Sequence, residues 1–98
     1  MTWKLFQIGY NFYFQEQCLD TMIRDQLHKT LEKIESLENP LDYENVLTTC
    51  PSHKRVIIKL PGSEYLLGII IHWKDDPQIE YRNSIELVKV ISPLELLD

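Results

Sequence analysis

Glycine is scarce in this chain. Its 98 residues include three glycines, Gly9, Gly62 and Gly68, which stand far apart in the sequence. A phosphate-binding loop needs clustered glycines at the start of a helix, so that backbone amides can approach the phosphate. The sequence therefore excludes nucleotide binding by a glycine-rich loop.

Cysteine and histidine are also few, and their spacing matches no metal-binding pattern. The cysteines are Cys18 and Cys50, and the histidines are His28, His53 and His72. Two cysteines are typical of a reduced thiol protein rather than of a disulfide scaffold. Cys50 and His53 could suggest a thiol nucleophile, but nothing in the sequence supplies an orienting third group. We expect no metal site, no cofactor and no catalytic thiol.

Long apolar runs are absent. A membrane-spanning helix needs about 18 or more consecutive apolar residues, and the longest run here is Leu66 to Ile71, which Gly68 interrupts. The N-terminus lacks the basic and then apolar order of a signal peptide. We expect a cytoplasmic protein without a membrane segment.

Basic residues are fewer than acidic ones. Ten Lys and Arg against fifteen Asp and Glu leave a net charge of -5. Proteins that bind nucleic acid usually have more basic than acidic residues, so contact with RNA or the ribosome is disfavoured on average. The composition, with 44% apolar and 26% charged residues, is that of an ordinary globular protein. We expect one domain over residues 1–98.

The spacing of apolar residues changes twice along the chain. Residues 2–15 are rich in aromatic and β-branched side chains, which predicts a long strand bent at Gly9 or two short ones. Over residues 17–38 apolar residues recur every three or four positions, which predicts an amphipathic helix ending before Pro40. Residues 39–53 read as a connector with one short helical turn.

The last third predicts an antiparallel meander. Strands are expected over 55–60, 64–73 and 84–92, with residues 79–82 beginning the last of them. Because Leu66 to Ile71 does not alternate with polar residues, this strand is expected to be central. Its second face is either covered or a contact surface. The tail from Leu94 to Leu97 is expected to form a helical turn or to dock on another chain.

The predicted fold class is therefore α+β: an antiparallel four-stranded sheet packed by one long amphipathic helix, in the order β-α-β-β-β. In such a meander the start of the strand at Arg55 lies beside the end of the strand at His72. Basic and titratable side chains would gather there. They are His53, Lys54, Arg55, Lys59, His72, Lys74, Tyr81 and Arg82.

This element order resembles the RelE/ParE superfamily of bacterial toxins. The resemblance rests on the helix ending in Glu38-Asn39-Pro40, the connector and the three strands that follow. It implies a metal-free, RNA-cleaving or translation-inhibiting toxin, or a gyrase-directed one, neutralised by an antitoxin. Carried over by position, it implies catalytic roles for Arg55, which would stabilise phosphate, and for His72 as general acid or base. It places Tyr81 and Arg82 near the scissile group.

A different class of function fits the same residues. The chain could be a non-enzymatic protein–protein interaction module whose sheet face or leucine tail binds a protein partner or a second copy of itself. The C-terminal Leu94-Glu95-Leu96-Leu97-Asp98 carries no catalytic side chain. Expression toxicity would separate the toxin from the module.

Overall fold

The computed structural model describes residues 3–52 and 54–97. Its helices are α1 (Asn11–Cys18) and α2 (Thr21–Ser36), and its strands are β1 (Lys4–Phe6), β2 (Val46–Thr49), β3 (Arg55–Lys59), β4 (Leu66–His72) and β5 (Ser84–Ile91). Three short 3-10 turns cover Pro40–Asp42, Ile79–Tyr81 and Pro93–Leu97. No helix in the described part of the chain combines the length and the apolar character needed to cross a bilayer.

The α+β class is confirmed, but the sheet differs from the expected one. It has five strands in the order β1-β5-β4-β3-β2, and β1 pairs parallel with β5 while the other neighbours are antiparallel. The extra strand β2 lies in the expected connector. Its four residues are mostly exposed and too few to show a clear alternation, although three of them are β-branched. The predicted four-stranded antiparallel sheet and the order β-α-β-β-β are therefore wrong in detail.

The amphipathic helix is confirmed as α2, although it is shorter than the predicted span of 17–38. Asp20 caps its N-terminus by accepting a hydrogen bond from the backbone N–H of Ile23 at 3.0 Å. Leu37 lies in extended geometry at the other end. The apolar stripe faces the sheet, with Leu27 and Ile34 fully buried.

The predicted strand over residues 2–15 is wrong beyond β1. The chain turns at Gly9, whose φ of +74° favours glycine, and then forms α1. Aromatic residues favour strands on average, but in this helix Phe12 is buried, while Tyr13 and Phe14 are exposed. The Gln15 side chain accepts a hydrogen bond from the Val90 N–H at 2.9 Å and joins α1 to β5.

The meander of β3, β4 and β5 is confirmed, and β4 lies in the middle of the sheet. Residues 79–81 form a 3-10 turn rather than the start of the last strand, because the Ile79 side chain is exposed and has no core to join. The tail after Ser92 forms the expected helical turn.

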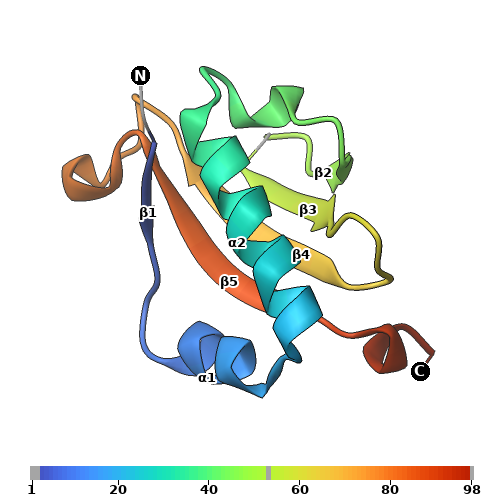
Figure 1. Ribbon diagram of the computed structural model, residues 1–98. Coiled ribbons are helices and arrows are strands. Elements are labelled where there is room, and N and C mark those ends of the chain that lie inside the picture. The colour runs from blue at the N-terminus through green and yellow to red at the C-terminus, as the bar shows by residue number, and fades with distance from the viewer. Residues whose placement is uncertain (1–2, 53, 98) are drawn as a thin grey trace.

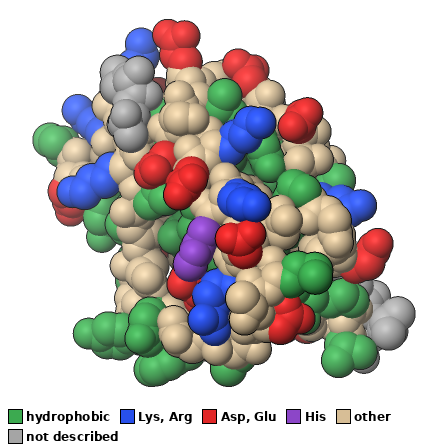
Figure 2. Space-filling view, viewed as in Figure 1, with side chains coloured by type: hydrophobic (Ala, Val, Ile, Leu, Met, Phe, Trp, Pro, Cys, Tyr) green, Lys and Arg blue, Asp and Glu red, His purple; other side chains and the backbone are tan. Residues whose placement is uncertain are grey.

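The core lies between the sheet and α2. Figure 1 shows both helices on the viewer's side of the sheet, with α2 crossing the central strands. The same side seen in Figure 2 carries interspersed acidic and basic side chains. Each fully buried aliphatic side chain contributes roughly 1.5–3 kcal/mol. The buried apolar residues are Trp3, Phe12, Ile23, Leu27, Leu31, Ile34, Tyr43, Val56, Ile58, Leu60, Leu67, Ile69, Ile71, Ile85 and Val90.

Candidate functional site

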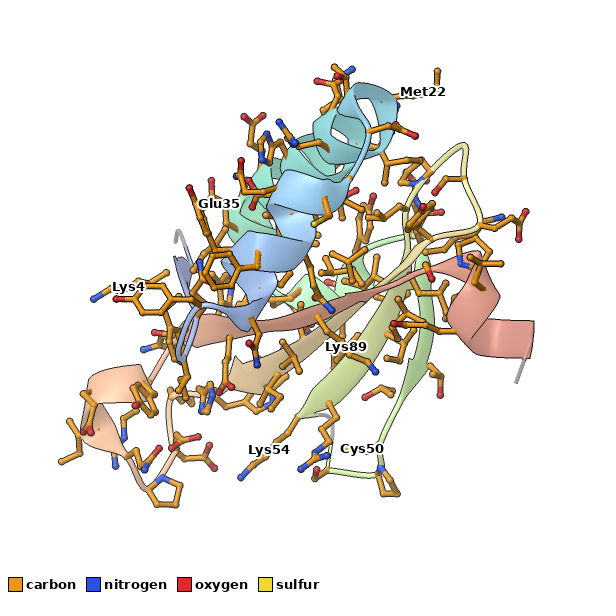
Figure 3. The ribbon with its side chains drawn as sticks, turned by 90° about the horizontal axis from the view of Figure 1, so that it is seen from below. Lys4, Met22, Glu35, Cys50, Lys54 and Lys89 are labelled. Atoms are coloured by element: carbon orange, nitrogen blue, oxygen red, sulfur yellow. The ribbon has the colours of Figure 1, made fainter. Side chains whose placement is uncertain are left out.

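The side of the sheet away from the helices is the candidate site, and we call it the outward face. Side chains alternate along a strand, so β4 sends Leu67, Ile69 and Ile71 to the core and the residues between them outward. Figure 3 shows the helices on one side of the sheet and the labelled Lys89 toward the other. None of the helices in the described ranges covers the outward face, where Ile70 is only partly buried.

A hollow lies at the centre of this face, above Gly68. It has a volume of about 150 Å³ and is bordered on the outward side by Ile57, Ile70, Val88 and Ile91. Gly68 causes the hollow, because a side chain there would project from the middle of the face. A Cβ built on Gly68 would come no closer than 3.7 Å to its neighbours, which is ordinary contact. The hollow is therefore space that a side chain could fill.

Two cations, Arg55 and Lys89, border the hollow, and a third, Lys59, lies on the same face. Arg55 is paired with Ile70, Lys59 with Leu66, and Gly68 with Lys89, and directly paired residues lie on the same face. Arg55 and Lys89 are exposed and also border the hollow. The outward face thus combines an apolar centre with a basic rim on a chain of net charge -5.

A histidine bridged by two carboxylates lies on the same face, toward the end of β4. His72 Nδ1 is 2.9 Å from Asp76 Oδ2, and Nε2 is 3.0 Å from Glu86 Oε1. The three side chains are 12%, 8% and 17% exposed. The Phe6 ring stacks on the Tyr81 ring, with ring centroids 4.8 Å apart, and both rings contact the His72 imidazole.

Asp76 is the most strongly held member of this cluster. The backbone N–H of Gln78 donates to its Oδ1 at 2.8 Å, and this bond together with His72 lowers the pKa of the carboxyl below its usual range. Because the two carboxylates contact opposite nitrogens of one ring, they do not converge on a common point. The cluster ties β4, β5 and the loop between them together.

The structure brings the four predicted site residues to one end of the outward face. Tyr81 lies against His72, with ring centroids 5.3 Å apart. Arg55 on β3 is paired with Ile70, which lies two residues before His72 on β4. Arg55 and His72 are therefore diagonal neighbours, with Cα atoms roughly 7–8 Å apart. Arg82 Nε donates to the Asp76 carbonyl at 2.7 Å. Both nitrogens of His72 are engaged, so a general base there would first have to release a carboxylate.

Cys50 has a setting that the sequence did not reveal. Its Sγ lies 3.1 Å from the Ser52 hydroxyl and 3.3 Å from the backbone N–H of Arg55, at the end of the β2–β3 hairpin. These contacts, the Ser52 hydroxyl first, lower the pKa of the thiol from 9.0 to about 6. The spacing Cys50-Pro51-Ser52 was the only signal, and only the hairpin brings the donors to the sulfur. His53, which together with Cys50 could have suggested a thiol nucleophile, lies outside the described residues.

The comparisons with known proteins supply no family for this chain. No protein-family model matches it, and neither the curated proteins nor the solved structures give a match. The RelE/ParE resemblance and the roles that it implies for Arg55, His72, Tyr81 and Arg82 stay predictions. The function therefore has to be inferred from the geometry of the outward face.

Proposed function

We propose that this protein is a non-enzymatic interaction module that binds an acidic, partly apolar segment of another protein on its outward face. The observation that carries the proposal is the hollow above Gly68, with Arg55 and Lys89 on its border and Lys59 on the same face. Exposed apolar surface rimmed by polar residues is typical of protein interaction sites.

The hollow sets the size of the apolar group. A protein cavity of about 150 Å³ lined by aliphatic and aromatic side chains can bind a benzene-sized molecule, and the hollow above Gly68 has that volume. One leucine, isoleucine or phenylalanine side chain of the partner would fill it. Filling it would also remove Ile57 and Ile70 from water, which supports binding through the hydrophobic effect.

The rim sets the charge of the partner. At physiological salt, interactions between exposed charges are screened beyond about 8 Å. A segment on the outward face therefore experiences the nearby Arg55, Lys59 and Lys89 more strongly than the net charge of -5. Carboxylates flanking the apolar anchor would meet these cations. Binding should weaken as the salt concentration rises.

Site-specific photo-crosslinking in the native host tests this proposal. A photoreactive residue placed at Val88, on the rim of the hollow, should give a protein adduct. The same residue at Met22, an exposed apolar position on α2, is the matched control and should not give that adduct.

The captured partner should then bind the purified protein through the hollow and the rim. We expect Gly68→Val, which fills the hollow, and Lys89→Glu, which reverses one rim charge, each to weaken binding about tenfold or more. Unchanged affinity in both variants, or an equal adduct from Met22, would overturn the proposal. A second copy of the chain as the adduct would assign the face to self-association instead.

A second candidate is the RNA-cleaving or translation-inhibiting toxin. The observation that favours it is the grouping of His72 and Tyr81 at 5.3 Å with Arg55 nearby on the same face. Expression in bacteria should then arrest growth, and His72→Gln combined with Arg55→Glu should relieve the arrest. Normal growth on expression of the folded protein would exclude this candidate and leave the interaction module.

A further inference from the structure

The two tryptophans of the chain line a cavity that the outward face does not use. The rings of Trp3 and Trp73 meet edge to face, with centroids 5.5 Å apart and planes at 86°. The cavity has a volume of about 410 Å³, and its other lining residues in the described part of the chain are Glu38, Lys74, Asp75 and Asn83. This volume lies within the range of about 300–1,000 Å³ found for small-molecule sites.

Trp3 is held rigidly in the wall of this cavity. Its backbone N–H donates to the Glu35 carbonyl at 2.9 Å, and its indole N–H donates to the Glu38 carbonyl at 3.1 Å. The residue is 7% exposed. Because the indole N–H is already used, Trp3 offers the cavity aromatic carbon rather than a hydrogen-bond donor.

The position of the cavity follows from the fold. β1 begins beside the C-terminal end of α2, and Trp73 follows the last residue of β4. Figure 1 shows these three segments meeting at one corner of the molecule. Trp73 succeeds the outward-facing His72, so it lies on the helix side of the sheet, where Trp3 is. Two indoles far apart in the sequence thus form two perpendicular walls.

The charge around the cavity favours a cation. Glu38 and Asp75 contribute two carboxylates, and Lys74 contributes one positive charge, among the lining residues that the structure describes. An indole attracts a cation to its face, the more strongly when the cation is desolvated.

We propose that the Trp3–Trp73 cavity binds a small soluble organic cation with an alkylated ammonium head, of the trimethylammonium type. Such a head has no N–H donors, so it needs aromatic walls and diffuse negative charge rather than directed acceptors. A guanidinium would need a planar, bidentate carboxylate, and a metal ion would need converging ligands. Among the described residues, no group of three or more His, Cys, Asp or Glu side chains could hold a metal ion.

Intrinsic fluorescence tests the proposal directly, because both tryptophans of the chain lie at the cavity. The probe is choline, and its matched control is 3,3-dimethylbutan-1-ol, which has the same shape with carbon in place of the charged nitrogen. We expect a saturable fluorescence change with choline and binding about tenfold weaker for the alcohol.

Substitutions around the cavity test whether choline binds there. Asp75→Asn and Glu38→Gln change exposed side chains, so they should fold normally and weaken choline binding. Lys74→Gln removes the opposing charge and should strengthen it. Lys29→Gln, on an exposed α2 residue paired with Asp25, is the matched control and should change nothing. Trp73→Leu should abolish binding.

Three results would overturn the proposal. The first is equal binding of choline and the neutral alcohol, which would leave only an apolar cavity. The second is choline binding that Asp75→Asn, Glu38→Gln and Trp73→Leu all leave unchanged. The third is a response to phosphatidylcholine vesicles, against phosphatidylglycerol vesicles as control, without any response to free choline, which would assign the headgroup to a membrane surface.

Discussion

The two faces of the sheet have similar aliphatic residues but different roles. On the helix side, Leu67, Ile69 and Ile71 of β4 are at most 2% exposed. On the outward face of the same strand, Leu66 and Ile70 are partly buried, and Gly68 opens a hollow between them. The helix side is a packed interior, and the outward face is a surface available for binding. The comparison teaches that a run of apolar residues can serve stability through one set of side chains and recognition through the other.

The largest expected effect comes from truncating matched residues on the two faces. Ile71→Ala should lower the free energy of unfolding by about 2–5 kcal/mol, because it leaves a cavity in the core. Ile70→Ala, one residue earlier, should lower it by about 1 kcal/mol or less, since the outward side chain is already partly in water. Urea denaturation of both variants measures the difference. Equal losses would show that the outward face is also a structural interior.

The thiol at the hairpin end gives the next largest effect. With a pKa of about 6, Cys50 should be mostly thiolate at neutral pH, and alkylation by iodoacetamide should show a midpoint near pH 6. Ser52→Ala removes the first contributor to the lowered pKa, so the midpoint should rise and the rate at pH 6 should fall. Mass spectrometry in a Cys18→Ser background measures both. A midpoint that does not move in Ser52→Ala would contradict the role of the hydroxyl.

The histidine cluster should make the outward face sensitive to acid. The pKa of Asp76 is lower in the folded protein than its ordinary value of 3.8, so ionised Asp76 stabilises the fold above that value. This stability is lost as the pH falls through the folded pKa. Asp76→Asn should therefore lower the urea midpoint at pH 7 and flatten its decline below about pH 4. A variant with the same acid profile as the parent would exclude this role.

The smallest effect is expected at the hollow. Gly68→Ala should leave stability unchanged or raise it by about 0.4–1 kcal/mol, because alanine restricts the unfolded chain and its Cβ meets only ordinary contacts. Thermal unfolding measures the change. A clear loss of stability would mean that the strand needs glycine for its own backbone, and the hollow would then be a by-product of folding rather than a feature of the surface.

Local pattern was sufficient for α2 and for the meander. Apolar residues at every third or fourth position predict the helix, and β-branched and apolar runs between turn residues predict the strands, so both signals lie within each segment. The same reasoning placed Leu66 to Ile71 at the centre of the sheet. Three features were missed, namely α1, β2 and the parallel pairing of β1 with β5. The first and third depend on partners remote in the sequence, whereas β2 pairs with the nearby β3 but is too short and too exposed to show a period of its own.

The candidate site was predictable in part for the same reason. Arg55, Lys59 and His72 could be assigned to neighbouring strands, and their placement on one face follows from the register. Lys89 was not identified, because a register shift in β5 between its pairings with Gly68 and Ile69 decides how it faces the hollow. The donors around Cys50 and the pairing of Trp3 with Trp73 come from a hairpin and from a contact across seventy residues.

By itself, the sequence determined which elements form the two layers: one amphipathic helix and three consecutive apolar strands. It also determined that the middle strand, Leu66 to Ile71, must be buried on at least one face. It could do so because burial selects apolar residues at intervals set by backbone geometry. Only the tertiary structure decided which face of β4 is covered by α2 and which charged side chains border the outward face. It also decided that the rings of Trp3 and Trp73 meet. Those outcomes depend on distances between segments remote in the chain, and no local periodicity encodes them.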